Sequence, residues 1–232
     1  MLPADTRVLA GAEAIAAEAC RLISAAAAVA IAQRQLFRLV LAGGSTPGRA
    51  YELLAASSQR WTAWEIFWGD ERCLPATDPA RNSRQAQALW LDRVAIPAGQ
   101  IHPIPAELGA APAAAKYAEL IVDKQPFDLV LLGMGEDGHT ASLFPDAEAQ
   151  TAPVIAISNA PKLPAARVSL NFQTLRACRR QLVMITGTEK AAALAAWQQG
   201  ESLPISRAVR GDACLLVDAS TGQSADLVTP VF

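Results

Sequence analysis

The 232-residue sequence lacks several features that mark common protein classes. Its cysteines are scattered without a Cys-x-x-Cys pair, which argues against a zinc site or a redox dithiol and is typical of reduced thiols in the cytoplasm. The formal net charge is −2 and Lys and Arg form no long run, so we expect no nucleic-acid partner. No cluster of metal-ligating residues is evident in the sequence, so we also expect no metal site.

The sequence also lacks an obvious membrane segment. Its most apolar stretch, residues 24–32, is shorter than the ~20 apolar residues that a membrane-spanning helix requires. No basic segment precedes the first apolar stretch, so we expect no secretory signal peptide. These observations predict a cytoplasmic protein without a membrane partner, and they leave open whether it is a monomer or a small homo-oligomer.

Apolar residues make up 52% of the chain, which is ample for the core of a single domain over residues 1–232. Helical patterns are expected at 8–34, 49–57, 82 onward, 110–122 and 187–198. Short apolar runs predict strands at 36–42, 65–68, 101–105, from 127, 154–158, 167–172, 181–186 and 214–217. This alternation predicts an α/β fold: a doubly wound, mostly parallel Rossmann-like sheet with helices on both faces.

The most informative segment runs from Phe127 to Pro145, where a buried strand enters a glycine-rich turn. Loops at the carboxyl ends of such strands are where ligands bind in open α/β sheets. Asp137 and His139 stand two residues apart on this turn. A neutral imidazole is a natural general base near pH 7, and a nearby carboxylate fixes its tautomer. A capping Asp beside a structural His is the alternative interpretation.

Ser142 follows this pair closely, so a Ser-His-Asp triad has to be considered. The sequence lacks the G-x-S-x-G elbow that exposes a nucleophilic serine. We therefore expect Ser142 in the first turn of a helix, with His139 activating water instead.

A second glycine-rich turn, residues 43–47, separates a predicted strand from a predicted helix. Gly43 and Gly44 allow close backbone approach, Ser45 or Thr46 can cap the helix, and Pro47 suits its first position. Free amides at a helix N-terminus attract a phosphate group. Neither Gly-Lys-Ser/Thr nor GxGxxG occurs in this turn, which disfavours nucleotide and dinucleotide sites. An ordinary βα turn remains the alternative.

Several charged residues could complete an anion site. Arg72 suits phosphate or an oxyanion, and Asp70 could hold a sugar hydroxyl or orient a base. Arg167 in a strand and Lys190 near a helix start could reach the same crevice. Taken singly, each could equally be a solvated surface charge.

Together these blocks resemble the 6-phosphogluconolactonase family. The matching segments, in the family's order, are Leu41 to Pro47, Gly69 to Arg72, Asn82-Ser83, Gly133 to Pro145, Arg167 to Leu170 and Thr186 to Ala191. The resemblance implies a Rossmann-like fold and hydrolysis of 6-phosphoglucono-1,5-lactone in the oxidative pentose phosphate pathway, without a cofactor.

The resemblance and the local chemistry imply the same residue roles. The turn at Gly43, Gly44, Ser45 and Thr46 would hold the 6-phosphate, with Lys190 and Arg167 as cationic partners. His139 would take a proton from the attacking water and return it to the ring oxygen. Asp137 would support His139, and Arg72 would stabilise the oxyanion or hold substrate.

Two other functions remain open at this point. Glucosamine-6-phosphate deaminases share the Gly-Gly-Ser-Thr-Pro loop and the Asp-Gly-His core, but they typically carry a Glu five residues after the histidine. Here that position is Phe144, which favours the lactonase. A non-catalytic sugar-phosphate sensor is the other alternative, although a sensor has no need of the Asp137–His139 pair.

Overall fold

The computed structural model describes residues 1–146 and 150–222. Within these ranges, a six-stranded sheet has the order β1-β9-β8-β5-β2-β3, and every neighbouring pair is parallel. Its strands are β1 (Asp5–Leu9), β2 (Phe37–Leu41), β3 (Trp64–Trp68), β5 (Phe127–Gly133), β8 (Cys178–Ile185) and β9 (Cys214–Asp218). The predicted α/β class is confirmed.

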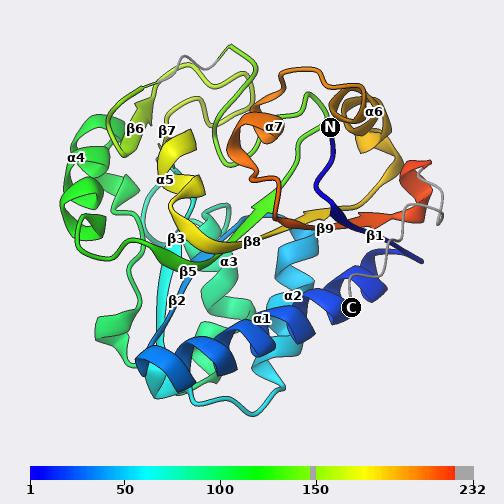
Figure 1. The fold of residues 1–232 in the computed structure, drawn as a ribbon. Coiled ribbons are helices and arrows are strands. Elements are labelled where there is room, and N and C mark those ends of the chain that lie inside the picture. The colour runs from blue at the N-terminus through cyan, green and yellow to red at the C-terminus, as the bar shows by residue number, and fades with distance from the viewer. Residues whose placement is uncertain (147–149, 223–232) are drawn as a thin grey trace.

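Helices cover both faces of this sheet (Figure 1). Helices α1, α2 and α3 lie on one face, and α5 and α7 lie on the other. The helices are α1 (Ala12–Arg34), α2 (Ser45–Ala55), α3 (Asn82–Leu89), α4 (Ala110–Ile121), α5 (Phe172–Arg176), α6 (Ala191–Gln198) and α7 (Pro204–Ala208). A short 3₁₀ turn, η5 (Thr188–Lys190), precedes α6.

A small antiparallel sheet accompanies the parallel one, and the sequence patterns did not reveal it. Within the described ranges it consists of β4 (Asp70–Arg72), β7 (Arg167–Leu170) and β6 (Val154–Ile157), in the order β4-β7-β6. The predicted strands at 154–158 and 167–172 therefore exist but belong to this second sheet. Helix α4 packs against it, on the side of the parallel sheet where α5 lies (Figure 1).

Gly69 joins the two sheets. Its N–H donates to the Leu41 carbonyl in the parallel sheet at 2.9 Å, and its carbonyl accepts from the Leu170 N–H of β7 at 2.8 Å. The chain thus leaves β3, turns at Gly69 and enters β4 in the antiparallel sheet. Residues that are adjacent in sequence, on either side of Gly69, therefore belong to different sheets.

The predicted helix at 8–34 is partly wrong, because Asp5–Leu9 forms the edge strand β1 and α1 begins at Ala12. By length and composition α1 could cross a membrane. In the structure its buried positions recur at helical spacing, from Ile15 and Ala16 to Ala30 and Ile31, and the helix contacts β2, β5 and β9. This pattern is that of a helix packed on a sheet.

The strand order reverses between β5 and β2, since β3 lies beyond β2 while β8 and β9 lie beyond β5. Ligands bind at such a switch point in open α/β sheets, outside the carboxyl ends of the strands. The two glycine-rich turns singled out in the sequence follow β2 and β5. The topology therefore brings them together at this edge.

Candidate active site

A cavity of about 310 Å³ lies at the switch point. Its walls come from the carboxyl ends of β2, β3 and β5, from β4 and β7, and from the loops that follow them. The predicted site residues that line it are Gly43, Gly44, Asp70, Arg72, His139, Arg167 and Lys190. Asn82, Phe144 and Lys162 also line it.

The other predicted residues lie around this cavity. Ser45 lines a neighbouring cavity of about 420 Å³, to which Gly44 and Arg72 also contribute. The Thr46 hydroxyl hydrogen-bonds to the Thr186 hydroxyl at 2.6 Å. This bond ties the turn after β2 to the segment after β8, which leads to Lys190.

The Asp137 and His139 side chains form a hydrogen-bonded pair. Asp137 Oδ1 contacts His139 Nδ1 and also accepts the His139 backbone N–H at 3.2 Å. Burial would raise the pKa of Asp137, but the hydrogen bonds from His139 outweigh it, and the pKa is lowered. An ionised carboxylate only accepts, so Nδ1 carries a proton and the lone pair of neutral His139 is on Nε2.

The turn that carries this pair requires glycine. A Cβ on Gly135 would lie 2.0 Å from His139 Nδ1, so a side chain there would displace the ring. Gly138 has φ +78°, in the region that glycine favours, and a hydrogen bond of 2.8 Å joins Gly135 N–H to the His139 carbonyl. The Phe144 ring also packs against the imidazole, with 4.8 Å between the two ring centres.

The turn after β2 differs from its prediction in one respect. Helix α2 begins at Ser45 with Gly44 as N-cap, so neither hydroxyl caps it and Pro47 is its third residue rather than its first. The first N–H groups of a helix have no intrahelical partner. Here they belong to Gly44, Ser45 and Thr46, since Pro47 has none. The turn therefore has unpaired helix N-terminal amides, and the Ser45 hydroxyl is not used for capping.

Alternation along β4 separates two sets of side chains. Asp70 and Arg72 line the cavity, whereas the intervening Glu71 points away from it, because successive strand residues face opposite sides. Arg72 lies directly opposite Arg167 in the β4–β7 register. Opposite residues of an antiparallel pair share a face, so both guanidinium groups face the cavity.

Both carboxylate oxygens of Asp70 have partners in the protein. Oδ2 accepts from the Ser142 hydroxyl at 2.6 Å and Oδ1 from Asn82 Nδ2 at 3.1 Å. Burial raises the pKa of Asp70, and the Ser142 hydrogen bond opposes that rise. The expected helix at Ser142 is wrong: residues 140–143 form a tight turn closed by a bridge, and Ser142 is committed to Asp70.

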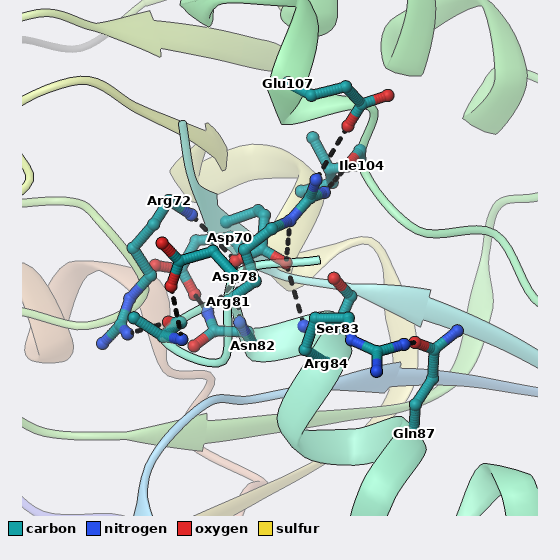
Figure 2. Close-up of polar contacts among 12 residues, drawn as sticks. Asp70, Arg72, Asp78, Arg81, Asn82, Ser83, Arg84, Gln87, Ile104 and Glu107 are labelled. Carbon is teal, nitrogen blue, oxygen red and sulfur yellow. Dashed lines mark hydrogen bonds and ion pairs between the residues drawn. The ribbon is translucent and has the colours of Figure 1, made fainter. Parts of the chain in front are cut away.

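Glu71 binds the backbone at the start of α3 directly. Figure 2 shows three residues of this helix start, Arg81, Asn82 and Ser83. Glu71 is fully buried, and its carboxylate accepts the backbone N–H groups of Asn82 and Ser83 at 2.8 and 2.9 Å. Arg81 lies 3.4 Å from Glu71 and donates to Glu107 and to the Ile104 carbonyl. Asn82 and Gln85 have the spacing of a capping box, but the N-cap is Arg81, and Glu71 of β4 supplies the acceptor.

The Asn82 side chain leaves no room for a side chain at Gly43, the first glycine of the turn after β2. Its Nδ2 is bound to Asp70, and a Cβ on Gly43 would lie 2.1 Å from its Oδ1. Asn82 thus packs directly on the Gly43 backbone. Asn82 lies in one of the segments that resemble the family, but local sequence patterns gave it no role at the cavity.

Four cationic side chains among the described residues line the cavity, from separate elements. They are Arg72 of β4, Lys162 of the β6–β7 loop, Arg167 of β7 and Lys190 of η5. Arg72 also donates to the Ala80 carbonyl, and Lys190 lies 3.6 Å from Glu189. Burial lowers the pKa of Arg167, while neighbouring Asp70 opposes this. Across residues 1–146 and 150–222, no group of three acidic, His or Cys side chains could hold a metal ion.

The fold and cavity define an α/β protein with a His–Asp pair facing a cationic pocket at the switch point of its sheet. A family model described as glucosamine-6-phosphate isomerases/6-phosphogluconolactonase matches residues 10–217. The chain belongs to this family.

Relatives named 6-phosphogluconolactonase occur in Mycobacterium leprae, at 37% identity over 78% of this chain and 81% of the relative, and in Nostoc, at 38% over 72% and 73%. A 6-phosphogluconolactonase structure from Thermotoga maritima has a TM-score of 0.85 at 27% identity, covering 92% of this chain and 98% of that one. A monomeric glucosamine-6-phosphate deaminase is 19% identical with a TM-score of 0.81, and this likeness shows the fold alone.

Proposed function

We propose that this protein is a cytoplasmic enzyme that hydrolyses 6-phosphoglucono-1,5-lactone to 6-phosphogluconate in the oxidative pentose phosphate pathway. Its relatives named 6-phosphogluconolactonase support this reading. The observation that carries the proposal is the Asp137–His139 pair at the cavity, with the Phe144 ring packed 4.8 Å from the imidazole. Phenylalanine has no titratable group, so the ring-opening step of a deaminase would lack its usual acidic partner.

The phosphate group would bind at the turn after β2. The free N–H groups of Gly44, Ser45 and Thr46, together with the positive end of the α2 dipole, favour an anion there. Gly43 allows the backbone to come close, and Lys190 would add a positive charge from η5. Lys190 is held nearby because Thr186 hydrogen-bonds to Thr46.

The chemical step would use His139 as the base. Its Nε2 takes a proton from water while the water oxygen attacks the lactone carbonyl carbon, C1. The bond between C1 and the ring oxygen then breaks, and protonated His139 returns its proton to that oxygen. The new carboxylic acid loses its proton to solvent. Asp137 holds the ring in the required tautomer and stabilises the imidazolium.

Two further residues complete the proposed site. Arg72 would stabilise the negative charge that develops on the former carbonyl oxygen bonded to C1, because its guanidinium faces the cavity close to β7. Asp70 would act as a positioning residue, since both of its carboxylate oxygens hold other wall residues.

The decisive test is lactone hydrolysis. The lactone would be generated in situ and its loss followed against a blank without protein, with glucosamine 6-phosphate tested in parallel for ammonia release. Loss above the blank without ammonia supports the lactonase. Ammonia release would establish the deaminase instead, and binding of 6-phosphogluconate without turnover would favour a sensor.

A further inference from the structure

The loop between β6 and β7 carries a cation to the cavity for which the sequence patterns gave no role. Lys162 lines the cavity, whereas Leu163 beside it is 90% exposed. Residues 160–165 form a closed loop, since the Ala160 N–H donates to the Ala165 carbonyl at 3.0 Å. A charged side chain directed to the cavity from such a surface loop needs something that fixes the loop.

Arg167 provides this anchor. Its Nε donates to the Pro164 carbonyl at 3.0 Å, and its Nη2 donates to the carbonyls of Lys162 and Leu163 at 3.0 and 3.3 Å. The guanidinium carbon also lies 5.7 Å from the centre of the Phe144 ring. Arg167 is 6% exposed, so these bonds form in a largely desolvated setting where they hold the loop firmly.

Lys162 forms only a weak ion pair with Glu136. Its ammonium lies 3.2 Å from Glu136 Oε1, and the two side chains are 46% and 57% exposed. Ion pairs between exposed side chains contribute little to stability, so Lys162 can leave Glu136 for a ligand at small cost. A ligand anion inside the cavity would be less hydrated than the exposed Glu136 carboxylate and would therefore attract the ammonium more strongly.

The position of Lys162 indicates which end of a ligand it meets. Glu136 directly precedes Asp137, the partner of His139, so Lys162 reaches the cavity at the histidine end. Lys190 reaches it near the turn after β2, through the Thr46–Thr186 bond. The proposed product has a phosphate at one end and a carboxylate, formed beside His139, at the other.

We propose that Lys162 binds the carboxylate end of the product, and the developing negative charge at C1 before it, and that Arg167 is the positioning residue that holds the Lys162 loop. This inference rests on the proposed lactonase function. It gives Arg167 a role different from the phosphate contact expected from the sequence.

The test compares two acyclic ligands that differ only at C1: 6-phosphogluconate, with a carboxylate, and sorbitol 6-phosphate, with a hydroxymethyl group. Dissociation constants are measured by isothermal titration calorimetry for the wild type and for Lys162→Gln. The control is Lys116→Gln, on the exposed side of α4 and outside the cavity lining. We expect Lys162→Gln to weaken 6-phosphogluconate about tenfold, as for loss of one charge-assisted contact, and to leave sorbitol 6-phosphate unchanged.

Three outcomes would each overturn the Lys162 assignment. Lys162→Gln could weaken the binding of both ligands equally, its effect could be no larger than that of Lys116→Gln, or the wild type could bind neither ligand. The wild-type lactone assay separates this from the function itself. Hydrolysis without a Lys162 effect removes only this inference, whereas carboxylate-selective binding without hydrolysis keeps it and removes the lactonase.

Arg167 is tested by a double-mutant cycle on the same two ligands. Arg167→Lys keeps the charge but cannot reach the three carbonyls with a single ammonium. If Arg167 acts by holding the loop, this change weakens 6-phosphogluconate selectively in the wild-type background and has little further effect in Lys162→Gln. Additive losses in the double variant would show that Arg167 contacts the ligand directly. Should Arg167→Lys fail to fold, the single Lys162 comparison still decides the proposal.

Discussion

Replacing Gly135 by alanine should disable the site while leaving the backbone intact. Gly135 is not among the glycines with positive φ, so alanine can adopt its conformation. The new Cβ would lie 2.0 Å from His139 Nδ1, where ordinary contact begins at 3.4 Å. The imidazole must therefore move by about 1.4 Å, the difference between these two distances.

This displacement sets the expected loss of activity. It pulls Nδ1 away from Asp137 and moves Nε2 relative to the bound lactone. A misplacement of about 1 Å can cost ~10²-fold in rate. A general base contributes ~10²–10⁴-fold in total, so we expect Gly135→Ala to lower kcat by at least ~10²-fold, but by no more than His139→Ala does. Overpacking should also lower the free energy of unfolding by about 1–3 kcal/mol.

The assay is lactone hydrolysis at saturating substrate, with circular dichroism to verify folding. Gly99→Ala is the matched control, because it adds the same methyl group where nothing lies within 4 Å. The double variant Gly135→Ala/His139→Ala should match His139→Ala alone, since the methyl group acts through the ring. A folded Gly135→Ala enzyme with the kcat of the wild type would refute this reasoning, as would a double variant far slower than His139→Ala.

Three further predictions follow from the geometry. Lys190→Ala should raise KM with little change in kcat, because a phosphate contact is equal in ground and transition states; an unchanged KM would place Lys190 outside the phosphate site. Glu71→Gln should lower the free energy of unfolding in urea by about 3 kcal/mol, since it breaks a buried ion pair and turns an amide against the α3 N–H groups, and a loss below about 1 kcal/mol would contradict this. The pKa of Asp137 is lowered, so its stabilisation is complete above the unfolded value of 3.8 and is lost as pH falls through the lower native value. The difference in Tm between the wild type and Asp137→Asn should therefore shrink as pH falls below about 4, and a constant difference down to pH 2 would argue against the pairing.

Strong local patterns allowed much of the fold to be predicted. The strand β5 was evident because an apolar run covered on both faces differs clearly from an amphipathic helix. The edge strand β1 was missed because its five residues run almost directly into the long alanine-rich pattern of α1, and the longer signal dominated. The antiparallel sheet was missed because β4 has only three residues, two of them acidic, and gains its strand character from pairing with β7.

In the site, too, the sequence predicted features that depend on neighbouring residues better than features that depend on residues in other elements. Asp137 and His139 are only two positions apart in the sequence, and their side chains are hydrogen-bonded in the structure as expected. The capping of α3 could not be read from local sequence, because Asn82 and Gln85 have the spacing of a capping box while the actual acceptor, Glu71, lies in β4. Lys162 gave no local signal at all. Its position at the cavity depends on Arg167, which binds the Lys162 loop. The sequence suggested Arg167 only as a positively charged contact for the phosphate.

The two sheets contribute different chemistry to one cavity, and Gly69 is where they meet. The parallel sheet supplies the turn after β2, with its free amides, and the turn after β5, with its histidine. The antiparallel sheet places Arg72 directly opposite Arg167, an arrangement of like charges that is unfavourable by itself. Each guanidinium is held by backbone carbonyls rather than by a carboxylate, so its charge is not neutralised by these bonds. Asp70 lies close enough to interact with both guanidinium groups and offsets part of their charge. An anionic ligand in the cavity would relieve the remaining repulsion, which is where the proposed reaction would generate negative charge.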